Sequence, residues 1–493
     1  MSTAANACPP PRCRCPTNPC RAYRVAITAR FAGQKYSGEI GLSAATALER
    51  RRPGMEPLCY GQLSVWRYLE RNPRDSWAQA NLTRLHRLAD GVTLRDLDTA
   101  FTTLWGRYET LRTTYDDGSG GIPLQIVHDA PESVLEVLEL EDGGAEEARR
   151  LVDESAARPF TFTDDFGWRH LVMVRSGRPV FLGLVAGHVV VDAWAMRHLE
   201  SELRWLFRHP EAVRPTEGAI VEGPRDMARE QRSPAWKRRR AMARDHWDRV
   251  LTGELDGLVP GSAAGPLAAP ADRFRAVLRL GAASGLVTAL ARRYRVFPQG
   301  VLLALLALGV ARLDQADRHI VWVMSSNRYE PPWNGLVTSM NQRVPMSVRM
   351  DPAEPLSAFV RRVQESAVQA CWNGSYDVDE MSRLALRLLG SDPDSGCLLN
   401  YAATGWPARA ADDPAAIPRA RVELGPSDRP APAKLYLVVS GADTISVQAH
   451  ADPAVFPEQT VRALLIGLEE SLRAAFTDPR IDLASLPSWS GSQ

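Results

Sequence analysis

The chain has 493 residues, of which 45% are hydrophobic, so it can bury an ample core and fill two or three domain-sized units. Its 59 basic and 58 acidic side chains give a formal net charge of +1, which leaves no overall charge to attract nucleic acid or a membrane surface. The longest apolar run, Val301–Leu313, is far shorter than the ~20 residues that a bilayer span needs and indicates a buried helix. We therefore expect a soluble protein that binds neither nucleic acid nor a membrane.

Four of the seven cysteines stand among prolines near the start of the chain, at positions Cys8, Cys13, Cys15 and Cys20. Their spacing lacks the paired C-x2-C knuckles of a zinc module, so we expect no metal site and a disordered start to an N-terminal extension, residues 1–50. Within it, Tyr23–Phe31 alternates partly like a strand and Gly33–Leu42 returns through glycines, which suggests an edge hairpin. The other cysteines are scattered, as in a reduced cytoplasmic protein.

Residues 51–208 mix helical and strand patterns and are predicted to form an N-terminal lobe. Amphipathic periodicity predicts helices at Leu58–Leu69 and Leu94–Leu111, and Phe160–Phe166 is a turn-rich loop. The expected strands are Ala80–Leu88, Leu124–Val127, Leu171–Val174 and Val180–Val185.

A bridge of low periodicity is expected over residues 209–235, and a basic helix that carries Lys237, Arg238, Arg239 and Arg240 is expected to follow. Acidic side chains share that helix, and aromatic residues are not interleaved with its basic ones, so we interpret it as a solvated face rather than a nucleic-acid site. The acidic residues are Glu230, Asp245 and Asp248.

Residues 236–493 are predicted to form a C-terminal lobe of the same mixed kind, with a flexible loop at Gly253–Asp272. The expected strands are Phe274–Leu280, Ile320–Met324, Leu435–Val439 and Thr444–Ala449. The expected helices are Ala283–Tyr294, Pro298–Leu313, Leu356–Ala370 and Glu458–Phe476.

The most informative stretch is Phe181–Leu206, FLGLVAGHVVVDAWAMRHLESELRWL. A buried strand that stops at Gly187 and turns into a helix leaves the side chain of His188 at the mouth of a scaffold element, where substrate can reach it. Histidine exchanges protons near neutral pH, so His188 is a candidate general base. Asp192 either caps the helix or turns inward to a cation and fixes the loop that carries His188. An isolated H-x-x-x-D also suits a buried histidine beside a helix cap.

The segment HVVVDAW resembles the active-site motif of the condensation domains of nonribosomal peptide synthetases, within the wider H-x-x-x-D acyltransferase superfamily. Other segments resemble further motifs of this family in the family's order, and together they run from about Leu58 to Asp478. These are Pro57–Trp66 (PLCYGQLSVW), Arg107–Tyr115 (RYETLRTTY), Ser326–Met346 (SNRYEPPWNGLVTSMNQRVPM), Tyr376 in WNGSYD, and Asn400–Tyr401. Each motif alone is weakly specific, whereas the ordered set is specific.

Two positions depart from the family motif, which usually begins with two histidines and ends in Asp-Gly. Gly187 replaces the first histidine and Ala193 replaces the final glycine, while His188 occupies the place of the chemically active histidine. These two changes put in question how tightly the loop that carries His188 is held. Relatives that only recruit a partner protein also carry altered forms of the motif, so a chain that binds without catalysing is an alternative from a different class.

The resemblance implies an α/β (α+β) fold of two chloramphenicol-acetyltransferase-like lobes, which form a V-shaped pseudo-dimer with a central tunnel. In such a fold His188 lies in the tunnel, and acyl or peptidyl carrier proteins thread phosphopantetheine arms inward to meet a small-molecule or carrier-bound acceptor. The resemblance implies no bound cofactor and no metal, and we expect a monomer.

The resemblance also assigns roles to the other residues of the motifs. Asp192 is structural and pairs with an arginine, either Arg328 or Arg112, with Arg328 preferred because it opens the second-lobe segment. Asn341 contacts the pantetheine arm or stabilises the oxyanion, or it only forms a turn. Gly187, Ala193, Trp194 and Tyr376 line the tunnel, although aromatic side chains at the last two positions also suit a core.

Motifs of rival chemistries are absent from the sequence: there is no G-x-S-x-G elbow, phosphate-binding loop, H-E-x-x-H pair or dinucleotide fingerprint. A carrier-attachment serine motif is also missing. The leading hypothesis is a free-standing condensation enzyme that makes an amide or ester from a carrier-bound acyl donor in natural-product biosynthesis. The alternatives are an acyl-CoA-dependent acyltransferase of the same superfamily and a recruitment module.

Overall fold

The structure is a computed structural model with two main hydrophobic cores. The residues that it describes are 55–118, 121–130, 135–141, 144–209, 222–253, 272–314, 317–331, 333–389, 396–403, 405, 415–427, 433–487 and 489. One core draws almost all its residues from positions 58–206, and the other lies within positions 243–489. The predicted N-terminal extension with its hairpin, most of the bridge and most of the Gly253–Asp272 loop lie outside the described residues.

A four-stranded sheet organises the first half of the chain. Its strand order is β2-β7-β6-β5, and only the β5–β6 pair is parallel. The strands are β2 (Asn81–Arg87), β5 (Glu136–Glu139), β6 (Trp168–Arg175) and β7 (Arg178–Gly187). The helices are α3 (Leu94–Arg107), α4 (Ala145–Ala156) and α5 (Ala193–Arg208).

Helices cover both faces of this sheet. On one face, a Cβ on Gly183 of β7 would meet Val152 of α4, so the helix packs directly on the strand. On the other face, Phe101 of α3 stacks on His170 of β6 with ring centroids 4.2 Å apart. Because β7 is central and covered, its residues from Phe181 to Gly187 are all buried, which explains their continuous apolar run.

A small antiparallel sheet of order β1-β4-β3 adjoins the first half and leads into helix α2 (Tyr60–Glu70). Its strands are β1 (Met55–Pro57), β3 (Thr113–Asp116) and β4 (Leu124–Val127). Cys59 precedes the helix, and its backbone N–H donates to Oε1 of Gln62 at 3.0 Å, which satisfies one of the amides at the start of the helix.

A seven-stranded sheet organises the second half, with strand order β10-β9-β11-β13-β14-β8-β12. Strand β11 runs parallel to both of its neighbours, and the other pairs are antiparallel. The strands are β8 (Phe274–Arg279), β9 (Arg318–Ser325), β10 (Gln342–Arg349), β11 (Cys397–Tyr401), β12 (Val422–Pro426), β13 (Leu435–Gly441) and β14 (Ile445–Ala451). The helices are α8 (Ser284–Tyr294), α9 (Pro298–Asp314), α10 (Leu356–Trp372), α11 (Val378–Leu389) and α12 (Glu458–Thr477).

Helix α9 lies in the core of this half, and residues Val301–Ala311 are almost entirely enclosed. Among the described residues, no single helix is long and apolar enough to cross a membrane. Helix α9 passes such a test only jointly with the preceding segment 281–294, and the two are bent by 103° relative to each other.

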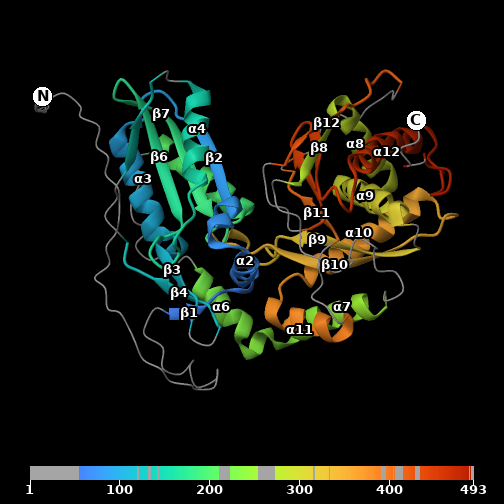
Figure 1. The fold of residues 1–493 in the computed structure, drawn as a ribbon, viewed down its shortest axis with the longest axis horizontal. Helices are drawn as coiled ribbons and strands as arrows, with labels where there is room; N and C mark the ends of the chain where they lie inside the picture. The colour runs from blue at the N-terminus through green and yellow to red at the C-terminus, as the bar shows by residue number, and fades with distance from the viewer. Residues whose placement is uncertain are drawn as a thin grey trace, which may run out of the picture.

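The two halves meet at their lower ends in Figure 1, where α6 (Pro224–Arg232), α7 (Lys237–Thr252) and α11 run beneath them. A third apolar cluster fills this junction and takes residues from α6, from the start of α2 and from the segment between β9 and β10. Its members are Cys59, Met227, Ala228, Trp333, Leu336 and Met340. A bidentate ion pair between Arg67 of α2 and Asp379 of α11, with both distances 2.8 Å, adds a second link between the halves.

Most predicted elements are confirmed within a few residues, and the clearest errors concern helix ends and the bridge. The helix predicted over Leu94–Leu111 ends at Arg107, because Tyr108 is extended and a 3-10 turn, Glu109–Arg112, follows. Part of the bridge is helical: α6 starts with Pro224 at its first turn, and the side chain of Asp226 accepts from the N–H of Gly223 at 3.0 Å.

The interpretation of the basic helix was wrong in part. Glu230 belongs to α6 and not to the basic helix α7. Lys237 and Arg238 are exposed, whereas Arg239 pairs with Glu330, and Arg240 donates to two backbone carbonyls. Only part of this face is therefore solvated. The lobe boundaries at 51–208 and 236–493 stay predictions.

Candidate active site

His188 stands on the turn that joins β7 to α5, as the sequence predicts. Strand β7 ends at Gly187, residues 188–190 form the turn, and α5 begins at Ala193 with Asp192 as its N-cap. The N–H of Val190 closes the turn by donating to the carbonyl of Gly187 at 2.9 Å. The His188 side chain is half-buried, so the protein holds it without enclosing it.

Gly187 lacks a side chain because an aromatic ring occupies that space. A Cβ on Gly187 would lie 2.6 Å from the ring of Phe162, nearer than real Cβ atoms approach their neighbours. Phe162 is itself buried in the first core, against Trp66, Trp77 and Tyr115. The position that the family motif usually gives to a histidine thus faces a packed ring, and the backbone that leads to His188 lies against an aromatic cluster.

Asp192 both caps the helix and pairs with a cation. Its Oδ1 accepts from the N–H of Ala195 at 2.9 Å, the contact of an N-cap residue. Its Oδ2 accepts from the guanidinium of Arg328 at 2.6 Å and from the N–H of Met340 at 3.0 Å. The two alternatives that the sequence left open are therefore combined, one on each carboxylate oxygen.

Arg328 is the arginine that meets Asp192, and its remaining contacts shape the segment that carries it. Its guanidinium also donates to the carbonyls of Ser326, Leu336 and Thr338 at 3.2, 3.3 and 2.8 Å. The chain between β9 and β10 thus folds around a cation that reaches across to the first half. The other candidate, Arg112, was wrong: its guanidinium donates to the carbonyls of Trp105 and His128.

Asn327 fixes the second half of the same segment. It adopts a left-handed backbone with φ of 55°, which asparagine tolerates better than most residues. Its side-chain amide donates to the carbonyl of Met340 at 2.8 Å and to that of Gly374 at 2.9 Å. The N–H of Met340 goes to Asp192, so both backbone polar groups of Met340 have partners of fixed position.

Ser339 and Asn341 complete the surroundings of His188. The hydroxyl of Ser339 lies 3.3 Å from Nδ1 of His188 and 3.2 Å from Oδ1 of Asn341. Asn341 is half-buried, and its amide nitrogen lies 3.5 Å from the sulfur of Met324. Ser339 is fully buried and was missed from the sequence, because a serine in a loop carries no signal of a contact 151 residues away.

The arginine-bearing motif at 107–115 supports the His188 turn from the other side. The hydroxyl of Thr110 donates to the carbonyl of Val190 at 3.0 Å. Glu109 binds Arg225 of α6 through both carboxylate oxygens, at distances between 2.6 and 3.1 Å. The sequence identified this motif only by its resemblance, and the structure gives its residues a role in holding the turn.

Three further residues that the sequence placed in the tunnel have different surroundings. Ala193 is the first residue of α5 and is half-buried. Trp194 is 45% exposed, and its indole N–H donates to the carbonyl of Asn334 at 3.2 Å, which links the two halves. Tyr376 belongs to the second core: it packs edge-on against Trp247 and donates to the carbonyl of Arg343 at 2.5 Å. The tunnel assignment of Tyr376 was therefore wrong.

Cys59 is the cysteine near this site, and its chemistry is that of a packed thiol. It is fully buried, and its sulfur lies 3.7 Å from the carbonyl oxygen of Ser339. Burial raises the pKa of the Cys59 thiol to about 11, so the thiolate needed for nucleophilic attack does not form near neutral pH. The described residues also contain no group of three or more His, Cys, Asp or Glu side chains placed to hold a metal ion.

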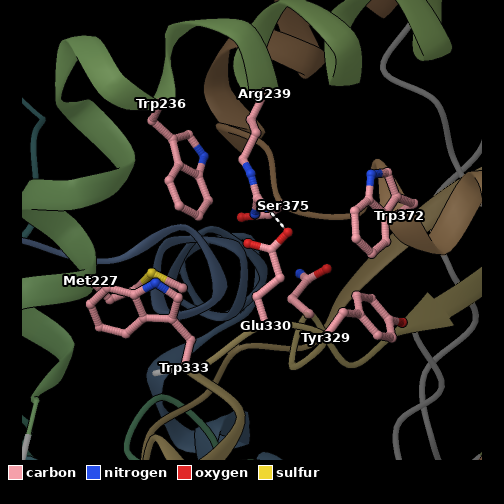
Figure 2. A pocket seen from close by; sticks show the side chains of 9 residues that line it. Met227, Trp236, Arg239, Tyr329, Glu330, Trp333, Trp372 and Ser375 are labelled. Atoms are coloured by element: carbon pink, nitrogen blue, oxygen red, sulfur yellow. Dashed lines mark ion pairs between the residues drawn. The ribbon is translucent and has the colours of Figure 1, made fainter.

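A separate cavity of about 370 Å³, counted with its open mouth, adjoins the same segment. Asn327 lines it, together with aromatic side chains and the Arg239–Glu330 ion pair. Figure 2 shows the Glu330 carboxylate facing Arg239, with Trp236 on one side and Trp372 on the other. The guanidinium of Arg239 lies 4.5 Å above the ring of Trp236. The two charged side chains that line the cavity, Arg239 and Glu330, pair with each other. His188 does not line this cavity.

Comparisons with known proteins identify the family of the chain. The family model described as "Condensation domain" matches residues 68–392, about two thirds of the chain. The chain belongs to the condensation-domain family. Cyclosporin synthetase of Tolypocladium inflatum is 23% identical over 473 residues, which cover 88% of this chain and 3% of the synthetase. The chain therefore spans only a small part of the length of such curated relatives.

Solved condensation-domain structures share the fold of the chain. The first condensation domain of the calcium-dependent antibiotic synthetase, in complex with a substrate analogue, matches with a TM-score of 0.67 at 16% identity over 89% of this chain and 99% of that one. The X-domain from teicoplanin biosynthesis, in complex with OxyB, matches with a TM-score of 0.66 at 20% identity over 89% of this chain and 96% of that one. The predicted mixed α/β fold of the condensation family is thereby confirmed.

Gly61 of α2 offers a test of how tightly this condensation-domain site is packed. A Cβ at Gly61 would overlap the backbone of Ser339 and Met340. Gly61→Ala is therefore expected to push the 339–340 backbone away from Asp192 and to lower the free energy of unfolding by roughly 1–3 kcal/mol, measured by denaturant titration.

Gly106 of α3 is the matched control, since a Cβ there meets no atom within 4 Å. Gly106→Ala is expected to leave stability unchanged or to raise it by up to about 1 kcal/mol, because alanine is the better helix former. Equal stability of Gly61→Ala and the wild-type protein would contradict the close contact.

Proposed function

We propose that this chain is an enzyme that transfers an acyl or aminoacyl group from the phosphopantetheine thioester of a carrier protein to an amine or hydroxyl acceptor. The product is an amide or ester in a nonribosomal or related natural-product pathway. The observation that carries the proposal is the placement of His188: Nδ1 contacts Ser339 of the second half, and Nε2 has no hydrogen-bond partner among the described residues. The His188 side chain is half-buried, and we assign the side of the ring that carries Nε2 to the substrate.

His188 Nε2 acts as the base in the proposed reaction. It takes a proton from the acceptor nitrogen or oxygen while the lone pair of that atom forms a bond to the thioester carbonyl carbon. The tetrahedral intermediate collapses as the C–S bond breaks, and the pantetheine thiolate leaves with the electron pair and accepts the proton from His188. No covalent enzyme intermediate is needed, which agrees with the protonated state of the Cys59 thiol.

Donor and acceptor are proposed to enter from opposite faces of a tunnel between two chloramphenicol-acetyltransferase-like lobes that form a V. The support for this arrangement is the condensation-domain fold and the position of His188 at contacts between the halves. A tunnel orients both reactants and limits water, which would otherwise hydrolyse the thioester. One N–H of Asn341 faces Met324, and we assign the other to the pantetheine arm or to the developing oxyanion.

The second candidate function is recruitment of a partner protein without catalysis. The similarity to the X-domain that is in complex with OxyB favours this function, as does the loss of the first motif histidine at Gly187. The packing of Phe162 against Gly187 accounts for that loss without loss of His188, so we prefer the enzymatic function.

His188→Ala separates the two functions. We expect product formation to fall by about 10²- to 10⁴-fold, the usual contribution of a general base, with no change in the melting temperature beyond a few degrees. The measurement is a single-turnover assay with an acyl donor on a carrier protein, followed by mass spectrometry of the product.

His209→Ala is the control, because His209 is exposed at the far end of α5 and its loss is expected to leave turnover unchanged. Wild-type turnover by a correctly folded His188→Ala protein would rule out His188 as the catalytic base, and with it the proposed reaction.

The choice of donor separates a carrier-dependent enzyme from an acyl-CoA-dependent one. Contacts with a carrier protein supply binding energy that helps to assemble the transition state, so removal of the carrier should lower kcat as well as raise KM. We expect one acyl chain to react at least about tenfold faster from a phosphopantetheinylated carrier protein than from coenzyme A or a short pantetheine thioester. Equal rates from these donors would instead identify an acyl-CoA-dependent transferase.

A further inference from the structure

We infer that Ser339 is a positioning residue that fixes the proton of neutral His188 on Nδ1 and leaves the lone pair on Nε2. In this arrangement Nδ1–H of His188 donates to Oγ of Ser339, and the hydroxyl of Ser339 donates to Oδ1 of Asn341. The inference rests on the proposed function only where it makes Nε2 a base. The hydrogen-bond chain itself follows from the geometry.

The donor and acceptor roles along this hydrogen-bond chain are set at the end away from His188, by Asn341 and Met324. The amide nitrogen of Asn341 lies 3.5 Å from the sulfur of Met324, which is an acceptor and cannot donate. Reversal of the amide would place Oδ1 against that sulfur, so two acceptors would face each other. The orientation that avoids this contact points Oδ1 at Ser339, which must then be the donor.

The single proton of the Ser339 hydroxyl carries this direction to His188. A serine hydroxyl has one O–H to donate and two lone pairs with which to accept. The Ser339 hydroxyl has two neighbours at hydrogen-bond distance, Oδ1 of Asn341 at 3.2 Å and Nδ1 of His188 at 3.3 Å. Once its proton points to Asn341, the Ser339 oxygen can only accept a hydrogen bond from Nδ1 of His188. The neutral imidazole must therefore carry its proton on Nδ1, and Nε2 is left as the acceptor.

Ser339 is held firmly enough to impose this choice. It is fully buried, and the next residue, Met340, is fixed by hydrogen bonds to Asp192 and Asn327. Gly61 of α2 lies directly against the carbonyl of Ser339, which leaves no room for the loop to shift toward that helix. A buried hydroxyl on such a backbone is well placed to orient an imidazole.

The position of the proton is measured directly by ¹⁵N NMR on full-length protein labelled at histidine. Long-range ¹H–¹⁵N correlation distinguishes the two neutral tautomers, and the signal of His188 among the nine histidines is assigned by its loss in His188→Gln. At about pH 8.5, where unperturbed imidazoles are neutral, the wild-type protein is expected to show the Nδ1–H form. A wild-type signal from the Nε2–H form would overturn the inference, and this measurement needs neither substrate nor a variant of Ser339.

Three variants then test the hydrogen-bond chain at Ser339 and at Asn341. Ser339→Ala removes the acceptor of Nδ1–H, so the Nε2–H form, which water can solvate, should gain population. Asn341→Leu removes the acceptor of the serine proton, so the hydroxyl is free to turn and donate to Nδ1, and the imidazole should change to the Nε2–H form. Asn341→Asp keeps an acceptor oxygen and should preserve the Nδ1–H form. An unchanged His188 spectrum in both Ser339→Ala and Asn341→Leu would refute the chain.

Ser325→Ala is the matched control for loss of a buried serine–asparagine hydrogen bond. Ser325 is fully buried at the end of β9, and its hydroxyl donates to Oδ1 of Asn327 at 2.7 Å. This variant is expected to leave the His188 tautomer unchanged. A change in tautomer equal to that of Ser339→Ala would show that general loosening, and not the Ser339 hydroxyl, controls the imidazole.

Turnover provides the second readout. Ser339→Ala should lower kcat about tenfold with little change in KM, the effect of one lost hydrogen bond in the transition state. Unchanged kcat together with a changed tautomer would overturn the positioning role. The spectra require no substrate, so the tautomer is tested independently of the acyl-transfer proposal. Absence of turnover in the wild-type protein would refute the acyl-transfer proposal, whereas the hydrogen-bond chain is tested by the NMR measurement alone.

Discussion

The site depends on one buried ion pair, between Asp192 at the start of α5 and Arg328 in the segment that follows β9. Their side chains are only 3% and 2% exposed, and the carboxylate also caps α5 and accepts the N–H of Met340. Burial of two charges is costly, and such pairs often contribute little net stability. What this pair supplies is position: it joins the turn that carries His188 to the segment that carries Ser339 and Asn341, across the boundary between the two halves.

Residues from both halves of the chain support His188 around this ion pair. Phe162 fills the space beside Gly187 and holds the incoming strand, while Thr110 holds the turn through Val190. From the second half, Arg328 folds its own segment through three backbone carbonyls, and Asn327 holds Met340. Nδ1 of His188 contacts Ser339, and the proposed reaction uses the other ring nitrogen as the general base. The chain has the fold of the condensation-domain family, and these contacts support His188 although Gly187 and Ala193 depart from the family motif.

The sequence identified the residues that belong to a recognisable motif or local pattern. It missed the residues whose role depends on contacts between distant parts of the chain. The apolar run into Gly187 and the capping role of Asp192 followed from local patterns, and resemblance selected Arg328 over Arg112. Ser339 could not be found, because its contact with His188 joins residues 151 apart and a loop serine has no distinctive pattern. The sequence left Tyr376 between the tunnel and the core, because motif order says nothing about which way a side chain points, and the structure places it in the core. The ring of Phe162 occupies the space that a side chain at Gly187 would need, and no local pattern places these two residues together.

The most direct test of this account is a double-mutant cycle on the ion pair, with Asp192→Ala, Arg328→Met and the double variant compared by their free energies of unfolding. Each single change strands a buried charge and should cost roughly 3–5 kcal/mol. The double variant should be more stable than the sum of the single effects predicts, by more than about 1 kcal/mol. The exposed pair Arg74–Asp117 serves as the control and should couple by no more than about 1 kcal/mol. Additive effects at Asp192 and Arg328, within about 0.5 kcal/mol, would contradict the claim that this pair holds the site together.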